Sequence, residues 1–328
     1  MKAVVCKAYG PPENLVIQEI DSPKPGKGQV VISVKACGVN FPDTLIIQGK
    51  YQVKPPLPFT PGNEIAGIVK ELGEGVDHVQ VGDRVIVFTG GGGFAEEVVA
   101  DAMQLIPMPE DMDFVTASAF VLTYGTSHYA LKDRAQLKPG ETLLVLGAAG
   151  GVGLATIQIG KVMGARVIAA ASTDEKLAMC KQQGADELLN YAQEDLKERV
   201  KELTAGNGVD VVFDPVGGDY SEAALRGMAW GGRFLVIGFT AGNIPRIPLN
   251  LPLLKGCSIV GVFWGTFTAR NPKRNQEHLS ELLTWFASGK IHPVISATYP
   301  LDRVADALND IMNRKVTGKV VLLTEDGK

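Results

Sequence analysis

The feature that most constrains this chain is a glycine-rich turn between an apolar run and a helix-like stretch. Residues 142–146 read as a buried strand, residues 147–153 as Gly-Ala-Ala-Gly-Gly-Val-Gly, and residues 154–163 as a helix. In this context Gly150 lets the backbone approach a pyrophosphate and Gly153 lets the helix pack on the strand. The first N–H groups of the helix, from Gly151 and Val152 on, then face the phosphates. The alternative is a tight strand-to-helix turn without a ligand.

The chain around this turn alternates short apolar runs with amphipathic stretches. The apolar runs are residues 142–146, 166–171, 187–189, 209–214, 233–238 and 258–263, and the amphipathic stretches are residues 154–163, 175–183, 196–203 and 221–230. Such alternation predicts an α/β domain with a doubly wound parallel sheet of the Rossmann type.

The flanking parts have a different texture. Before about residue 120, short alternating runs are separated by Gly and Pro, which predicts a mostly antiparallel β domain. The segment from about residue 266, with two helices and a final strand at 318–323, is too short for a core of its own. We therefore predict a nucleotide-binding domain at 123–265 and a catalytic domain made of 1–122 and 266–328.

Charge and composition exclude several classes of function. The 328 residues carry a formal charge of −4, so nothing predicts a nucleic-acid partner. No apolar run approaches the roughly 18 residues of a membrane span, and the N-terminus does not resemble a signal peptide, so we expect a cytoplasmic protein with a small-molecule partner. The four cysteines are scattered, and the four histidines form no metal-binding pattern, so no metal site is predicted.

The choice of nucleotide depends on the end of the second strand of the parallel sheet. An NAD site usually has Asp or Glu there to hold the ribose 2′-hydroxyl, whereas this chain has Ala171. Ser172 and Lys176 follow, and they offer a hydroxyl and a cation suited to a 2′-phosphate. We therefore predict NADPH. As an alternative, Ser172 and Glu175 fit a helix capping box and Lys176 fits an ordinary surface position.

Several motifs along the whole chain share one resemblance. They are residues 38–43 (Gly-Val-Asn-Phe-Pro-Asp), 61–67 (Pro-Gly-Asn-Glu-Ile-Ala-Gly), 81–85, 140–153 with Gln158 and Lys161, 214–218 and 317–320. Together they resemble the quinone oxidoreductase and zeta-crystallin family of the medium-chain dehydrogenase/reductase superfamily, which implies a GroES-like catalytic domain. In its zinc-dependent relatives, the positions of Asn40 and Asn63 are a cysteine and a histidine that bind zinc. Amides cannot replace those ligands, so a zinc-free enzyme is expected.

The resemblance also implies roles for individual residues. Asn40, Asp43 and Tyr51 are implied near the nicotinamide in an interdomain cleft, with Thr126 at the carboxamide. The other residues implied in cofactor binding are Tyr191, Gly238, Phe239, Phe263, Trp264, Gly265 and Arg314. Simpler interpretations exist for some of them: Tyr191 and Phe239 as core aromatics, Asp43 as a helix cap, and Arg314 as a solvated charge.

Hydride transfer to a quinone or another electron-poor conjugated carbonyl fits a site without a Lewis acid, because hydrogen-bond donors can stabilise the charge that moves onto oxygen. A reductase of enals, enones or enoyl thioesters is the alternative, and a thioester would need basic residues such as Lys50, Lys54, Arg270, Lys273 and Arg274. A non-enzymatic NADPH-binding protein is a third possibility. The resemblance further implies a homodimer paired through residues 259–263.

Overall fold

The computed structural model describes residues 1–327, and contacts between Cα atoms divide the chain into two units. Unit 1 consists of Met1–Leu122 and Pro293–Lys328, and unit 2 is Thr123–His292. The sequence analysis instead assigned residues 266–292, with the rest of the C-terminal segment, to the same domain as residues 1–122. Residues 266–292 group with unit 2 because α10 (Pro272–Ala287) is bonded to the segment after α3 (Val121–Tyr129): His278 and Arg274 both lie against Asp133.

Unit 2 contains a six-stranded parallel sheet in the order β10-β9-β8-β11-β12-β13. The strands are β8 (Thr142–Val145), β9 (Arg166–Ala171), β10 (Glu187–Asn190), β11 (Val209–Asp214), β12 (Met228–Val236) and β13 (Ser258–Gly261). Numbered along the chain this is the order 3-2-1-4-5-6 of a Rossmann fold, as predicted. The direction of winding reverses between β8 and β11, which places the glycine-rich turn after β8 at the switch point.

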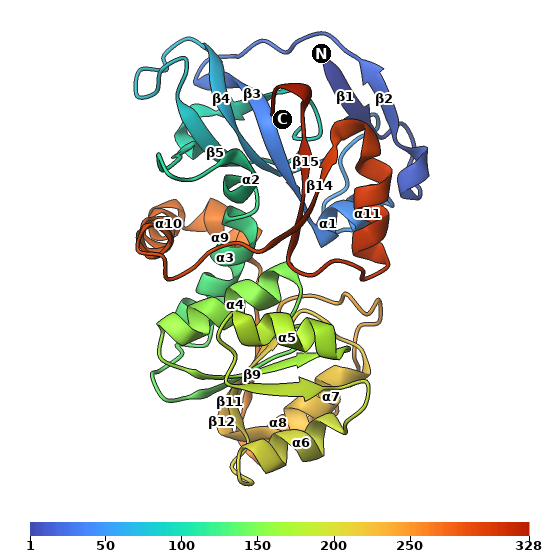
Figure 1. The fold of residues 1–328 in the computed structure, drawn as a ribbon, viewed down its shortest axis with the longest axis vertical. Coiled ribbons are helices and arrows are strands. Elements are labelled where there is room, and N and C mark those ends of the chain that lie inside the picture. The colour runs from blue at the N-terminus through green and yellow to red at the C-terminus, as the bar shows by residue number, and fades with distance from the viewer. Residues whose placement is uncertain (328) are drawn as a thin grey trace. The chain divides into compact units, whose positions relative to one another are not determined.

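Helices cover both faces of this sheet, as Figure 1 shows for α4 and α5 on one side and α6, α7 and α8 on the other. Their bounds are α4 (Gly151–Val162), α5 (Asp174–Gln182), α6 (Leu196–Leu203), α7 (Asp219–Arg226) and α8 (Asn250–Lys255), with α9 (Trp264–Arg270) and the π-helical turn η3 (Ala130–Arg134) outside the sheet layers. Strands buried on both sides explain the nearly continuous apolar runs: Val145, Ile168 and Phe213 are all fully buried.

Unit 1 is built on a mostly antiparallel sheet in the order β14-β15-β3-β4-β5-β7, with β6 also paired to β3. The strands are β3 (Gln29–Val39), β4 (Glu64–Leu72), β5 (Arg84–Phe88), β6 (Glu97–Asp101), β7 (Ile106–Pro107), β14 (Ile295–Pro300) and β15 (Lys319–Leu323), and a separate hairpin pairs β1 (Lys2–Val5) with β2 (Val16–Glu19). Only β14 and β15 pair in parallel within this sheet.

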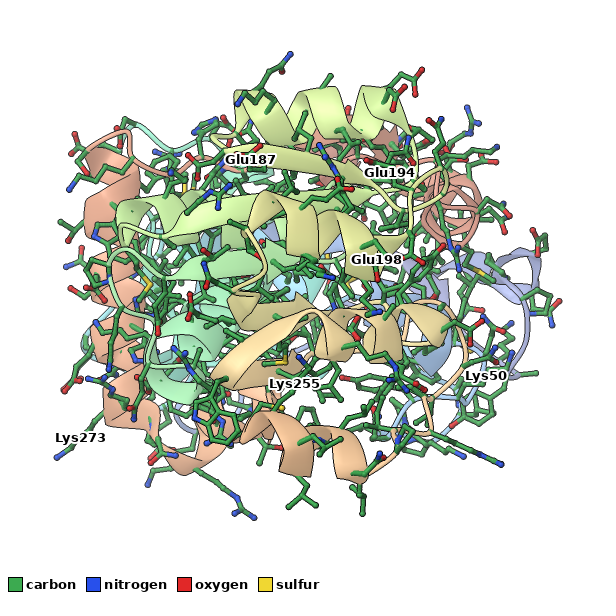
Figure 2. All side chains as sticks on the ribbon, turned by 90° about the horizontal axis from the view of Figure 1, so that it is seen from below. Lys50, Glu187, Glu194, Glu198, Lys255 and Lys273 are labelled. Carbon is green, nitrogen blue, oxygen red and sulfur yellow. The ribbon has the colours of Figure 1, made fainter. Side chains whose placement is uncertain are left out.

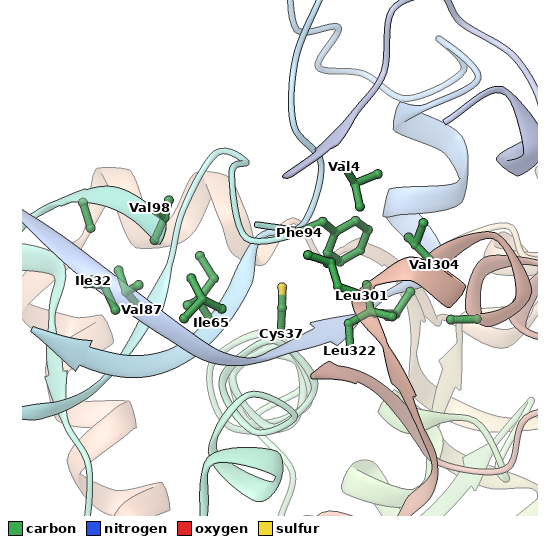
Figure 3. Packing of buried hydrophobic residues seen from close by; sticks show 14 of the residues in the cluster. Val4, Ile32, Cys37, Ile65, Val87, Phe94, Val98, Leu301, Val304 and Leu322 are labelled. Carbon is green, nitrogen blue, oxygen red and sulfur yellow. The ribbon is translucent and has the colours of Figure 1, made fainter. Parts of the chain in front are cut away.

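The core of unit 1 joins segments from both ends of the chain. Figure 3 shows Phe94 beside Val4, Leu301 and Val304, with Cys37 of β3 between Ile65 and Leu322. The helical elements of this unit are η1 (Pro12–Asn14), α1 (Phe41–Ile46), η2 (Ala102–Gln104), α2 (Phe114–Ala117), η4 (Leu301–Arg303), α11 (Val304–Met312) and η5 (Glu325–Gly327). Residues from Leu301 on thus contribute to this core.

Candidate functional site

The glycine-rich turn of unit 2 has the geometry of a phosphate cradle. Gly150 is the N-cap of α4 and provides no side chain for the free N–H groups of the first helical turn. A Cβ on Gly153 would lie 2.5 Å from the carbonyl oxygen of Ala148 and 2.6 Å from that of Gly147, so only glycine fits there. A Cβ on Gly150 would meet just one atom within 4 Å, the oxygen of Gly147 at 3.4 Å. The helix therefore packs tightly on the turn while its N-terminus stays accessible to an anion.

The other predicted cofactor residues of unit 2 follow the ends of parallel strands. Ser172 follows β9 and Tyr191 follows β10, while Gly238 with Phe239 follows β12 and residues 263–265 follow β13. Because all six strands are parallel, these carboxyl ends lie along the same edge of the sheet as the glycine-rich turn.

Thr126 lies on α3, and Trp264 connects that helix to the carboxyl edge. A Cβ on Gly125 would lie 2.7 Å from the Trp264 ring, and Trp264 is buried. Phe263, in contrast, is 52% exposed. The structure therefore places Gly125, the neighbour of Thr126 in the chain, against a tryptophan that follows β13.

The loop after β9 differs in one detail from the capping box considered above. Thr173, not Ser172, is the N-cap of α5, and its hydroxyl accepts the backbone N–H of Lys176 at 3.3 Å. The helix therefore starts one residue later than the box requires, because Thr173 has the extended backbone of a cap. The side chain of Ser172 is consequently not needed as the cap.

Two buried polar residues at this edge were not identified from the sequence. Asp214, at the end of β11, accepts the N–H groups of Val216 and Gly217 at 2.8 and 2.9 Å and the Ser221 hydroxyl at 2.5 Å. Burial raises the pKa of Asp214 even though these bonds oppose the shift. Its role is to order the turn across the switch point. The sequence feature that could have identified Asp214 is its place in the motif 214–218, at the end of an apolar run, because a buried aspartate there needs hydrogen-bond donors.

Asn190 is the second such residue. Its amide donates to Asp174 Oδ1 at 2.8 Å, so the carboxylate in the first turn of α5 has a defined partner. Next to Asn190, the ring of Tyr191 lies 4.4 Å from that of Tyr220 of α7. Tyr191 packs partly as a core aromatic, which was the simpler interpretation.

In unit 1, Asn40 and Asp43 form the start of α1. Asn40 is the N-cap, and its backbone N–H donates to Asp43 Oδ2 at 2.8 Å. Asp43 therefore does act as a helix cap, and it is fully buried. Its other oxygen, Oδ1, has no hydrogen-bond partner among the residues that the structure describes.

The Asn40 side chain lies in a buried network with two charged residues that the sequence analysis did not single out. Asn40 Oδ1 accepts a hydrogen bond from Lys319 Nζ, and Asn40 Nδ2 donates to Glu64 Oε2 at 3.1 Å and to the carbonyl of Gly38 at 3.3 Å. Lys319 Nζ lies 2.8 Å from Glu64 Oε2, and Glu64 Oε1 accepts the N–H of Leu122 at 2.8 Å. Glu64 and Lys319 both lie within motifs noted in the sequence, 61–67 and 317–320. A charged residue at the start of an apolar strand was the sequence feature that could have identified them.

This network has an unusual electrostatic effect. Burial raises the pKa of Asp43 to about 7, although the Asn40 N–H and the Lys319 ammonium act in the opposite direction. Burial, and secondarily the charge of Asp43, raises the pKa of Tyr51. Burial also raises the pKa of the Cys37 thiol. Asp43 is thus a carboxyl group that can gain or lose a proton near neutral pH.

Asn40 is buried and Asn63 half-buried; these are the two amides that the sequence analysis compared with zinc ligands. Among the described residues, no group of three or more His, Cys, Asp or Glu is placed to hold a metal ion. Over the same residues, no helix is both long and apolar enough to cross a membrane. Arg314 belongs to unit 1, where it follows α11 in a left-handed conformation with φ of 57°.

Of the basic residues considered for a thioester, Lys50 belongs to unit 1, and Lys273 and Arg274 belong to unit 2. Arg274 pairs with Asp133 at 2.9 Å and Glu277 at 2.8 Å, so its charge is matched. Lys50 donates to Gln48 at 2.8 Å, and Figure 2 shows Lys273 pointing away from the ribbon.

A Rossmann unit with its glycine cradle, combined with a mostly antiparallel unit, defines a medium-chain dehydrogenase/reductase. Two family models agree: residues 151–288 match the one described as zinc-binding dehydrogenase, and residues 26–110 match the alcohol dehydrogenase GroES-like domain. Within this superfamily, the chain belongs to the quinone oxidoreductase family.

Individual relatives support that assignment over the full length. The chain is 43% identical to the quinone oxidoreductase-like protein 2 homolog of Nematostella vectensis, covering 99% of this chain and 89% of that protein. It is 36% identical to the quinone oxidoreductase of Rattus norvegicus over 98% of both. The crystal structure of Escherichia coli quinone oxidoreductase complexed with NADPH matches with a TM-score of 0.92 at 31% identity, covering 98% of this chain and 100% of that one.

Proposed function

We propose that the protein is an NADPH-dependent oxidoreductase that reduces a quinone or a related electron-poor conjugated carbonyl. The observation that carries this proposal is the cradle at the switch point, where Gly153 leaves no room for a side chain and the N-terminus of α4 stays accessible. Support also comes from the related E. coli enzyme, whose structure contains NADPH.

Unit 2 would hold the cofactor through the N–H groups of Gly151, Val152 and Gly153 at the pyrophosphate. Ser172 and Lys176 would hold the 2′-phosphate, because Ala171 brings no repelling carboxylate to that position. Thr126, Tyr191, residues 238–239 and residues 263–265 would line the remainder of the cofactor in unit 2, and Arg314 is the cofactor residue that we propose in unit 1. When bound, NADPH supplies a hydride to the acceptor, which also takes up a proton.

Unit 1 would provide the residues on the acceptor side, Asn40, Asp43 and Tyr51. The pKa of Asp43 lies at about 7 and its charge acts on the Tyr51 hydroxyl, which supports a role for these two residues in delivering a proton to the reduced acceptor. The hydride and this proton together convert a quinone to a hydroquinone.

The experiment is a turnover assay that follows NADPH absorbance with quinones, enals, enones and enoyl thioesters. We expect quinones to give the highest kcat/KM. Faster turnover of enals or enoyl thioesters would support the alternative reductase, and NADPH binding without turnover of any acceptor would support a non-enzymatic role.

We also propose that catalysis needs no zinc, since amides stand at Asn40 and Asn63. Dialysis against a chelator should leave kcat unchanged. Activity that disappears after dialysis and returns with added zinc would contradict this.

A further inference from the structure

A buried ion pair flanks the strand that ends at Asn40. Glu64 is 0% and Lys319 is 4% exposed, and they open β4 and β15, the two strands on either side of β3. The register pairs Gly38 with Glu64 and Val39 with Val320, which brings Lys319 opposite Asn40. The sheet itself therefore sets the two charges against the Asn40 amide.

A buried ion pair is weak evidence for stability, because apolar residues of similar volume usually stabilise a core as well or better. The effect of this pair on the hydrogen bonds of Asn40 is more specific. Every hydrogen-bonding position on the Asn40 amide nitrogen is filled, one by Glu64 and one by the Gly38 carbonyl, and its oxygen faces the ammonium. An amide has two N–H donors, so Asn40 keeps no free N–H for a substrate.

The backbone of Asn40 continues the network toward the reaction side. Its N–H donates to Asp43 Oδ2, whereas Oδ1 of the same carboxyl group has no partner among the described residues. A fully buried oxygen without a partner is rare and marks a position where a ligand, a water molecule or a moving proton can bind. The chain of contacts thus runs from Lys319 through Asn40 to an oxygen of Asp43 that is available.

We propose that Lys319 is a positioning residue of the reaction site, which holds the Asn40 amide and through it fixes the Asp43 carboxyl group. In this arrangement Asn40 helps to position the Asp43 carboxyl group, and Asp43 is the group that exchanges a proton. Glu64 neutralises the buried ammonium and completes the support. This assignment rests on the proposed reductase function for its kinetic consequences but not for its structural ones.

The charges of the pair also act on Asp43 directly. The Lys319 ammonium lowers the pKa of Asp43 and the Glu64 carboxylate raises it, against a background of burial that raises it most. Removing the ammonium should therefore make Asp43 harder to ionise as well as less well positioned.

The test uses the full-length protein with Lys319→Met, which removes the charge, and Lys319→Arg, which keeps it. We expect Lys319→Met to lower kcat roughly tenfold or more while the NADPH dissociation constant changes less than about twofold. The apparent pKa in the pH profile of kcat should rise. Lys319→Arg should recover part of kcat. Lys70→Met serves as the control, because Lys70 is an exposed lysine of β4 that pairs with Glu97 at 2.5 Å.

A second arm does not depend on turnover. The carboxyl ¹³C signal of Asp43, assigned by its loss in Asp43→Asn, should titrate near neutral pH in the wild type and at higher pH in Lys319→Met. An unchanged titration and an unchanged kcat profile in the folded variant would overturn the proposal. If the wild type turns over no acceptor, the proposed function fails, and the ¹³C titration still decides the role of Lys319.

Lys319→Met leaves Glu64 buried without its partner, which can prevent folding. The double variant Lys319→Met/Glu64→Gln removes both charges and should fold. It should still lose kcat if Lys319 positions Asn40, and wild-type kcat in this variant would overturn the proposal.

Discussion

At the residue scale, we expect cofactor choice to depend on a few side chains at the end of β9. Ala171 is buried at the last position of that strand, where an acidic residue would repel a 2′-phosphate, and Lys176 lies in the first turn of α5. Thr173 makes the helix cap, so Ser172 can bind the phosphate without loss to the helix. Asp174, one of the two carboxylates in that turn, accepts a hydrogen bond from the Asn190 amide.

Lys176→Ala should weaken NADPH binding and leave NADH binding nearly unchanged. A charge-assisted hydrogen bond is worth about 1.5–3 kcal/mol, which corresponds to roughly a ten- to hundredfold change in affinity. Fluorescence titration with both cofactors measures this directly, and the effect should appear in KM for NADPH. Equal losses for both cofactors would mean that Lys176 supports the fold, and a wild-type preference for NADH would overturn the assignment of this loop.

Asp43→Asn should reduce kcat and raise stability at high pH relative to the wild type. The pKa of Asp43 rises from 3.8 to about 7 on folding, so the folded state binds more protons between those values. The wild type therefore loses stability as the pH rises through that window, and the variant avoids the loss. Urea unfolding at pH 5 and pH 8 tests this: a variant whose stability relative to the wild type is the same at both values would contradict it.

At the element scale, the contact between α4 and the glycine-rich turn needs glycine at one position. Gly153→Ala would place a Cβ 2.5 Å from a backbone oxygen, which cannot move aside as a side chain can. We expect a stability loss of about 1–3 kcal/mol and NADPH binding weaker by roughly tenfold or more. Gly90→Ala is the matched control, because a Cβ there meets nothing within 4 Å. Wild-type NADPH affinity in Gly153→Ala would contradict the cradle.

We expect the docking of α10 on α3 and η3 to depend on pH. His128 and His278 are buried with ring centroids 4.5 Å apart, and His128 Nε2 lies 2.7 Å from Glu281. The charged groups that face this pair are Lys132 and Asp133 of η3 and Arg274 and Glu281 of α10. Burial, and secondarily the neighbouring His278, lowers the pKa of His128 to about 4.

Because the pKa of His128 is depressed in the folded state, the unfolded chain binds the proton first as the pH falls from 6.5 toward 4. Stability is therefore present above about pH 6.5 and decreases below it, by on the order of 3 kcal/mol at most. His128→Asn should flatten the dependence of the urea midpoint on pH in this range. Parallel curves for variant and wild type would show that His128 does not carry the effect.

At the scale of the whole molecule, we propose a homodimer that pairs through β13. This strand ends the order of the parallel sheet and has β12 on one side, and Ile259 on it is 41% exposed. Nearby, Trp230 of β12 is 79% exposed and packs beside Gly256, and Leu253 of α8 is 78% exposed. An apolar edge of this kind invites pairing with another chain.

Sedimentation should show a species of twice 34.9 kDa at micromolar concentration. Ile259→Lys should shift it toward the monomer, because a charge in the paired edge has to be desolvated. Val81→Lys, at an exposed apolar position of unit 1, is the control and should not change the mass. A wild-type protein that sediments only as the monomer would contradict the proposal.

The sequence alone determined the local parts of this protein, because they depend on periodicity and on glycine placed next to a strand. The alternation of apolar runs predicted the doubly wound sheet, and the turn at 147–153 predicted the cradle. The positions of Ala171 at the end of a strand and of Lys176 at the start of the next helix could be predicted for the same reason, since neighbours in sequence set them.

Only the tertiary structure decided features that join distant segments. Lys319 reaches Asn40 and Glu64 because β15 and β4 flank β3, a pairing across 279 residues in the case of Lys319 and Asn40. The strand β14 and the grouping of α10 with unit 2 were missed for the same reason, because each is stabilised by partners far away in the chain. The unusual proton affinity of Asp43 also needed the structure, since burial sets it and a sequence does not show how deeply a carboxyl group is buried.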